Sequence, residues 1–315
     1  MNDAGKIVIN DSWILSKRGK KNKVDPFKPY GWLIEKELTA NGQIEDTVIV
    51  FLSNRECPFH CLMCDLWKNT CDDTVPEGAI TAQIKSVLDQ IHDVEHIKLY
   101  NSGSFFDHNA IPSNEYIQIA ELLKDFKTVI VESHPVFINK QILEFNSMLK
   151  PKLEIAIGLE TTNTEILKML NKRMNLEAFV QAVRFLKQNQ ISIRAFILLK
   201  TPFMTEQDGI HWAQRSLDFA FDAGVGCCTV VPVRAGNGCM DILRHTGQFS
   251  LPRISSLEKV LEYGIRLGKG RVFADTWDLE LFSDCSECFE KRTTRIRAMN
   301  LTQQNAESVF CACNL

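Results

Sequence analysis

The feature that most restricts the fold of this chain is a regular alternation of strand and helix patterns that begins near residue 46. Residues 47–53 (TVIVFLS) are nearly all apolar or β-branched, as expected for a strand buried on both faces. Residues 77–93 then carry apolar side chains at helical spacing. The pattern continues with strands expected at 96–100, 128–132, 153–159, 191–199 and 226–231, and helices at 114–126, 140–149, 164–170, 176–188 and 206–223.

Six β-then-α repeats predict an α/β fold with a parallel sheet and helices outside it. Periodicity alone fits both an open doubly wound sheet and an incomplete (β/α)6 TIM-like barrel; we expect the barrel. In either fold the functional groups lie at the C-terminal ends of the strands. The chain is expected to divide into an N-terminal extension, this core and a Cys-rich C-terminal extension, at residues 1–45, 46–235 and 236–315.

The two extensions carry weaker signals. A basic run at 16–23 (SKRGKKNK) is expected to be a solvated arm, with phosphate contact as the alternative. After residue 235 the alternation loosens, with a helix expected at 257–267 and a short strand at 271–274. The longest uncharged run, 223–233, is too short to cross a bilayer, and the first ten residues lack the basic start and apolar stretch of a signal peptide. We therefore expect a cytoplasmic protein with no membrane partner.

Cysteine is unusually frequent, at 11 of 315 residues, and clustered. In a reducing compartment, close-spaced cysteines more often hold metal than form disulfides. Cys57, Cys61 and Cys64 follow the first strand directly, with C-x3-C-x2-C spacing. An ordinary Fe–S cluster takes four protein ligands, so three would leave one iron free to bind something else. A single zinc would need a fourth ligand, and His60, adjacent to Cys61, is poorly arranged for one tetrahedral ion.

The segment CPFHCLMC resembles the cluster loop of the radical S-adenosylmethionine enzymes, with Met63 at the apolar position before the third cysteine. The resemblance implies that Cys57, Cys61 and Cys64 hold a [4Fe–4S] cluster whose free iron binds S-adenosylmethionine. It also implies reductive cleavage of this cofactor to a 5′-deoxyadenosyl radical, which abstracts hydrogen from the substrate. The electron would come from a flavodoxin- or ferredoxin-like reducing system.

Further expected cofactor contacts lie at strand ends. Residues 101–106 (NSGSFF) resemble the Gly-rich segment that meets the methionine end of the cofactor, although a simple strand-exit turn has the same composition. Carboxylates are rare in buried strands, so Glu132 and Glu160 at strand ends suggest hydrogen bonds to the cofactor's ribose or amino group; the alternative is an ion pair, for instance with Arg194 or Lys200. The full set is Met63, Ser102, Gly103, Ser104, Glu132, Ser133, Glu160 and Arg194.

Arg194 lies within the apolar fifth strand, where a charge should be paired. It therefore either orients a carboxylate at the site or simply neutralises one. Cys227 and Cys228 lie in the apolar sixth strand and are expected in the core. Cys239 follows the sheet near the expected barrel mouth, and we expect it to be inert rather than a hydrogen-atom donor.

The segments NSGSFFD, VESHPVFI, IGLETTNTEILKMLNK and ILLKTPFMTE resemble the elongator-like radical enzymes, especially the archaeosine-biosynthesis subgroup. The resemblance covers about 46–232 and implies a lysine-bearing 7-deazaguanine in transfer RNA as substrate. Two features depart from it: no additional RNA-binding domain is evident, and the net charge is −3. The alternatives are the same chemistry on a small molecule or peptide, or a non-catalytic zinc or Fe–S binding protein.

A second cysteine cluster lies in the tail. Two close pairs brought together by the fold are typical of zinc held by four thiolates, although a second [4Fe–4S] cluster or metal-free thiols fit the same spacing. Basic residues between the pairs are expected either to hold a phosphate or carboxylate or to form a solvated helix face. The cysteines are Cys285, Cys288, Cys311 and Cys313, and the basic residues are Lys291, Arg292, Arg295 and Arg297.

Overall fold

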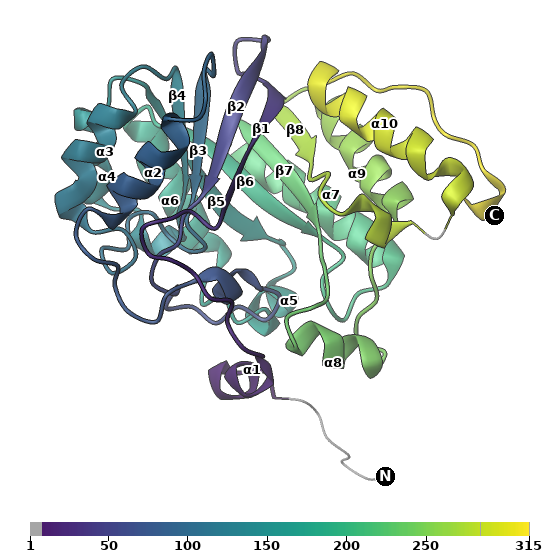
Figure 1. The fold of residues 1–315 in the computed structure, drawn as a ribbon. Coiled ribbons are helices and arrows are strands. Elements are labelled where there is room, and N and C mark those ends of the chain that lie inside the picture. Colours follow the sequence, from purple (N-terminus) through teal and green to yellow (C-terminus); the bar gives the residue numbers. More distant parts are fainter. Residues whose placement is uncertain (1–7, 284, 315) are drawn as a thin grey trace.

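The computed structural model describes residues 8–283 and 285–314, so the first seven residues of the expected N-terminal extension lie outside the described range. One eight-stranded sheet runs through it, with strand order following the chain. It curls around an interior and carries helices on its outer side (Figure 1). The strands are β1 (Gly31–Leu38), β2 (Ile44–Phe51), β3 (His96–Tyr100), β4 (Thr128–Glu132), β5 (Lys152–Glu160), β6 (Ser192–Leu199), β7 (Cys227–Pro232) and β8 (Arg271–Ala274).

The strand order distinguishes the two folds that periodicity allowed. A doubly wound sheet reverses its strand order, whereas here each strand pairs with its neighbours in the chain. β1 is antiparallel to β2, and every later pair is parallel. Among the described residues β1 does not pair with β8. The fold is therefore an incomplete TIM-like barrel with a seam between its first and last strands.

Every expected helix is present, although α2 and α3 are shorter than their periodic segments, whereas α1 and α8 were not expected. α7 shows how local sequence sets their limits: Thr205 and Asp208 form a capping box at its start, and Gly224 ends it with a φ of 108°. The helices are α1 (Asp11–Lys17), α2 (Ala79–Leu88), α3 (Tyr116–Leu122), α4 (Lys140–Met148), α5 (Thr164–Met169), α6 (Leu176–Gln188), α7 (Glu206–Ala223), α8 (Cys239–His245), α9 (Ile254–Leu267) and α10 (Ser286–Thr302).

The sheet extends beyond the segment in which the sequence showed clear repeats. β1 was not expected, because its inward positions alternate with exposed ones and include Glu35 and Glu37 instead of apolar residues. β8 adds one more parallel strand than the six expected repeats. The sheet thus crosses both expected boundaries, since β1 precedes residue 46 and β8 follows residue 235.

The main core lies between the sheet and its outer helices, but a second apolar cluster is more relevant to the site. It joins Ile14 of α1 and Leu62 of the cysteine loop to Leu170, which follows α5, and to Met240 of α8. Figure 1 shows α1, α5 and α8 at the same end of the barrel. In the described part of the chain, no helix combines the length and apolarity needed to span a membrane.

Candidate active site

The cysteine loop sits at the C-terminal end of β2 and is anchored from two distant segments. The Leu62 N–H donates to the Leu170 carbonyl at 2.9 Å. The Asn237 side chain donates to the carbonyls of Leu62 and Cys64, at 2.8 and 3.1 Å. Sequence reasoning did not identify Asn237, because a single Asn in a loop gives no signal of its own. These bonds hold the loop over the open end of the barrel.

The three thiols of the loop line a cavity of about 690 Å³ inside the barrel. Burial raises the pKa of Cys57 to about 11 and that of Cys64 to about 12, so in the protein alone these groups are neutral thiols near pH 7. Their sulfur atoms, together with that of Cys61, do not form a group within 4.8 Å of one another. Thiols that share one ion must be close, whereas each cysteine of an Fe–S cluster binds its own iron. The donor set therefore fits a cluster better than a single ion.

The Gly-rich turn after β3 packs directly against the cysteine loop. A Cβ atom on Gly103 would lie 3.3 Å from the Cβ of Cys57, which is tighter than an ordinary contact. Glu132 Oε1, at the end of β4, accepts the Asn101 N–H at 2.7 Å and the Gly103 N–H at 3.4 Å. Burial raises the pKa of Glu132 to about 7, although these N–H bonds work against it. The expected residues at the ends of β3 and β4 thus form one connected structure that lines the cavity.

Glu160 ends β5 in the same cavity, and its partner differs from those expected. Its carboxylate pairs with Lys172, whereas Lys200 pairs with Glu206. A Cβ on Gly158 would overlap the end groups of both Glu160 and Lys172, so any larger residue there would force the pair to shift. Burial works to lower the pKa of Lys172, but the Glu160 carboxylate and the nearby Cys61 raise it above its ordinary value. A cation therefore lies beside the cysteine loop.

His134 and Phe59 connect the loop to the end of β4. Their rings stack with centroids 4.1 Å apart and planes at 24°. His134 Nδ1 accepts the Val136 N–H at 3.2 Å, and Nε2 lies 3.0 Å from the Lys172 carbonyl, which it contacts as a donor. Burial lowers the pKa of His134 to about 4, so the ring is neutral near pH 7. The only sequence feature that could have marked His134 as a site residue is its position just after a strand.

Ser133 is buried beside His134, and its N–H donates to the Ala156 carbonyl at 2.9 Å. Ser104 Oγ accepts the His134 N–H at 2.8 Å. Ser102 has a φ of 54°, and its hydroxyl lies 3.4 Å from that of Tyr30. All the expected serines therefore line the same end of the cavity.

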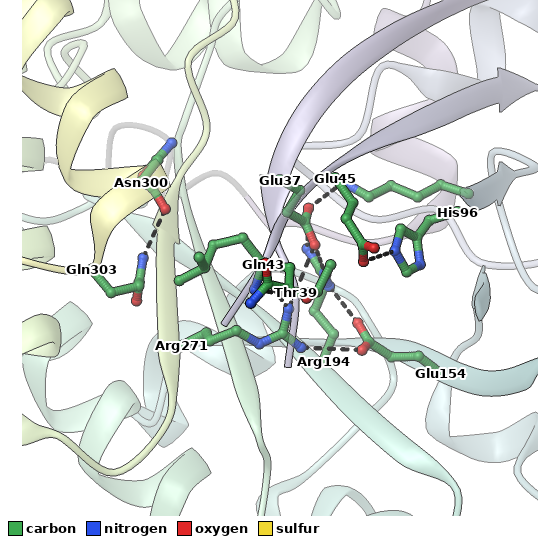
Figure 2. Close-up of polar contacts among 12 residues, drawn as sticks. Glu37, Thr39, Gln43, Glu45, His96, Glu154, Arg194, Arg271, Asn300 and Gln303 are labelled. Carbon is green, nitrogen blue, oxygen red and sulfur yellow. Dashed lines mark hydrogen bonds and ion pairs between the residues drawn. The ribbon is translucent and has the colours of Figure 1, made fainter. Parts of the chain in front are cut away.

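Arg194 lies near the start of β6 rather than at its C-terminal end. Its Nε donates to Glu154 Oε1 at 2.7 Å, and its Nη groups pair with Glu37 on β1 (Figure 2). Lys98 donates to the same Glu37 at 2.6 Å, and Arg271 lies within ion-pair distance of Glu154 at 3.4 Å. These ion pairs close the floor of the barrel. Arg194 neutralises carboxylates there, which is one of the two roles expected for it.

The four tail cysteines meet at the start of α10. Their sulfur atoms all lie within 4.8 Å of one another, which makes them a group able to hold a metal ion. Cys285 and Cys311 are 3.7 Å apart, and Cys288 and Cys313 are 3.5 Å apart. The Cys288 backbone N–H and the neighbouring thiols lower the pKa of Cys285 to about 7, which favours a thiolate ligand.

Two of the basic residues on α10 have structural partners. Arg292 and Arg295 are buried and pair with Glu258 of α9. They also donate to tail carbonyls, Arg292 to Val309 at 3.2 Å and Arg295 to Glu307 at 2.6 Å. By contrast, Lys291 and Arg297 are exposed.

Part of the basic run at 16–23 also forms ion pairs within the protein. Arg18 and Lys21 both pair with Glu56, which precedes the first cysteine.

Cys227 and Cys228 are buried in β7, as expected. Cys239 is buried under α1, and its Sγ lies 3.6 Å from the Ile14 carbonyl. Its surroundings fit an inert cysteine.

Two solved structures have the same fold. The chain aligns with Streptococcus suis SuiB bound to S-adenosylmethionine with a TM-score of 0.54 and 14% identity, over 74% of this chain and 51% of that one. It aligns with the archaeal Methanocaldococcus infernus Elp3 with a TM-score of 0.51 and 14% identity, over 70% of this chain and 58% of that one. The match thus spans little more than half of those chains. No protein-family model matches the sequence.

The chain thus shares the half-barrel fold of these two proteins, and its cysteine loop follows the first parallel strand directly. Its sequence is 23% identical to archaeosine synthase subunit beta of Methanosarcina acetivorans, over 87% of this chain and 84% of that protein. It is also 26% identical to an uncharacterised protein of Methanocaldococcus jannaschii, over 97% of this chain and 92% of that protein.

Proposed function

We propose that this protein performs radical S-adenosylmethionine chemistry on a modified nucleoside in transfer RNA. One observation carries the proposal: the cysteine loop, Gly103 and Glu132 meet at one end of a cavity, in a chain similar along most of its length to archaeosine synthase subunit beta. The name of that relative supports a nucleoside substrate, and a lysine-bearing 7-deazaguanine is the specific candidate.

Cys57, Cys61 and Cys64 would hold the [4Fe–4S] cluster. When bound there, the cluster would supply one-electron reduction of S-adenosylmethionine for hydrogen abstraction from the substrate, with the electron coming from a flavodoxin- or ferredoxin-like donor. Asn237 and Leu170 keep the loop in place through its backbone. Lys172 beside the loop offsets part of the negative charge that three thiolates bring into a buried site.

The strand-end residues would hold the cofactor. We assign the turn of Ser102, Gly103 and Ser104 to its methionine end, because the glycine leaves backbone free for close approach. Met63, the residue before Cys64, would contact it from the cysteine loop. Glu132, Ser133 and Glu160 line the same end of the cavity and offer acceptors for ribose hydroxyls or the amino group. We assign Arg194 to the barrel floor, because its guanidinium is already paired with Glu37 and Glu154.

The tail thiols would hold one zinc ion rather than a second cluster. A tetrahedral zinc with Zn–S bonds of about 2.3 Å places neighbouring sulfurs about 3.8 Å apart. The two close pairs, at 3.7 and 3.5 Å, match that spacing. A [4Fe–4S] cluster would need them farther apart, because each cysteine binds a different iron.

The test is anaerobic reconstitution, followed by dithionite reduction with S-adenosylmethionine and quantification of 5′-deoxyadenosine, iron, sulfide and zinc. We expect about four irons and one zinc per chain. Cys57→Ala should abolish 5′-deoxyadenosine formation, whereas Cys71→Ala, which alters a cysteine outside both clusters, should retain it.

Three results would contradict the proposal. Absence of iron and sulfide from the reconstituted protein would indicate a non-catalytic metal-binding protein. About eight irons per chain would show that the tail cysteines hold a second cluster rather than zinc. If a small molecule or peptide stimulates cleavage of S-adenosylmethionine but transfer RNA does not, the substrate is a small molecule or peptide. If the substrate is RNA, its binding should weaken steeply with salt, because phosphate contacts release counterions.

A further inference from the structure

The wall of the cavity formed by the ends of β7 and β8 takes no part in the proposed cofactor site. Arg234 follows β7, and Asp275 and Trp277 follow β8; all three line the cavity. The cofactor residues, in contrast, come from the ends of β2, β3, β4 and β5 and from Lys172. The cavity therefore has a second side that is available for a different ligand.

Trp277 on this side is held firmly although the residue is 43% exposed. The Trp277 backbone N–H donates to Asp275 Oδ1 at 3.1 Å. Arg234 Nη2 donates to the Trp277 carbonyl at 2.6 Å and to Asp275 Oδ2 at 2.9 Å. The Arg234 guanidinium also lies over Phe282, 5.4 Å from the ring centroid. An indole with fixed backbone and an exposed ring is arranged to receive a partner rather than to fill a core.

Trp277 also begins a row of aromatic rings along the cavity. Its centroid lies 5.3 Å from that of Phe51, at the end of β2, so the contact crosses the seam of the barrel. Phe51 lies 6.4 Å from Tyr100, which lies 6.2 Å from Phe196. All four rings line the cavity. Such a row suits a flat, aromatic ligand better than a charged or flexible one.

The same cavity is lined by a cation that has no ion-pair partner among the described residues. Arg297 of α10 lines the cavity, is exposed, and forms no ion pair with any residue that the structure describes. Its neighbours on that helix, Arg292 and Arg295, are both paired with Glu258. An unpaired guanidinium and an exposed indole that line one cavity are a combination suited to binding a base together with its phosphate.

We infer that the β7–β8 wall receives the target nucleotide, with Trp277 stacking on its base and Arg297 contacting an adjoining phosphate. Arg234 and Asp275 act as positioning residues for Trp277. This inference rests on the proposed function, since it takes a nucleotide as the substrate, but it concerns residues that the cofactor does not use. The two can therefore fail separately.

The experiment measures binding of unfractionated transfer RNA to the anaerobically reconstituted protein at several salt concentrations. Trp277→Ala should weaken binding about tenfold, a change equal to about 1.4 kcal/mol, and Trp277→Phe should recover most of it. The matched control is Trp32→Ala, because Trp32 is 38% exposed on β1 but does not line the cavity. Arg297→Gln should reduce the slope of log affinity against log salt by about 1.

The remaining results overturn the inference in distinguishable ways. If the parent protein binds no transfer RNA, the RNA substrate and this inference are both wrong. If Trp277→Ala binds as well as Trp32→Ala, the inference is wrong and the proposed function stands. If Trp277→Ala loses S-adenosylmethionine binding to the same extent, the indole supports the whole cavity instead of a base. If Trp277→Ala does not fold, an unchanged salt slope in Arg297→Gln, altered at an exposed position, is enough to reject the inference.

Discussion

Arg292 donates a hydrogen bond from Nε to the Sγ of Cys288, one turn earlier on α10, at 3.2 Å. The same guanidinium pairs with Glu258 and donates to the Val309 carbonyl in the tail. One side chain therefore contacts a thiol of the proposed zinc site, a neighbouring helix and the segment that supplies Cys311 and Cys313. Its positive charge therefore lies against one sulfur of the proposed zinc site, where it would offset part of the charge that the thiolate ligands bring.

Replacing Arg292 should weaken the binding of zinc by the tail cysteines. In Arg292→Lys the charge beside Glu258 remains, but the planar fork that reaches both Cys288 and Val309 is lost. We expect zinc transfer to a chromophoric chelator to be about tenfold faster, within the range known for residues that support metal ligands. Lys291→Ala, at an exposed position on the same helix, is the control. Equal release from both variants would contradict a supporting role for Arg292.

Glu160→Gln should strongly destabilise the protein. It leaves Lys172 as an uncompensated charge in a buried site, and breaking one side of such a pair costs about 3–5 kcal/mol. Urea unfolding of the metal-free protein measures the change. The control is Glu165→Gln, whose partner Lys168 is exposed, and there we expect less than about 1 kcal/mol. Similar losses in the two variants would mean that the buried pair contributes no more than a surface pair.

Gly103→Ala should impair cluster loading without unfolding the barrel. The added Cβ would lie 3.3 Å from that of Cys57, so the turn or the cysteine loop must shift by a few tenths of an ångström. We expect iron incorporation to fall at least twofold in parallel reconstitutions. Gly19→Ala, where a Cβ meets nothing within 4 Å, serves as the control. Full iron content in Gly103→Ala would show that the contact is not limiting.

Glu132 should make stability depend on pH. Burial raises its pKa from an ordinary value of 4.5 to about 7 in the folded protein, so folding favours the protonated form. The resulting stabilisation is present below about pH 4.5 and is lost as the pH rises through about 7.

Glu132→Gln removes this titration, so the variant should gain stability relative to its parent between pH 5 and pH 8. The gain is at most about 3 kcal/mol, since one pKa unit corresponds to about 1.4 kcal/mol. Urea unfolding of both metal-free proteins at the two pH values measures it. A difference between variant and parent that stays constant with pH would rule out Glu132 as the titrating group.

Much of the fold could be predicted because it depends on local patterns. β3, β4, β8, α6 and α7 have the expected limits, since apolar periodicity and flanking caps act over a few residues. β1 escaped notice because its inward side chains include Glu35 and Glu37. Carboxylates are unfavourable inside a barrel unless paired, and their partners Lys98 and Arg194 lie far along the chain.

The candidate site likewise combines features that could be predicted from the sequence with features that depend on the tertiary structure. The spacing of Cys57, Cys61 and Cys64 within one short loop made it possible to predict from the sequence that all three line one site, and the metal centre there stays a prediction. The pairing of Glu160 with Lys172, the anchoring of the loop by Asn237 and the position of Trp277 opposite Phe51 depend on how the strands close around the cavity. Contacts of this kind join segments that are distant in the chain, and only the curl of the sheet decides which of them meet.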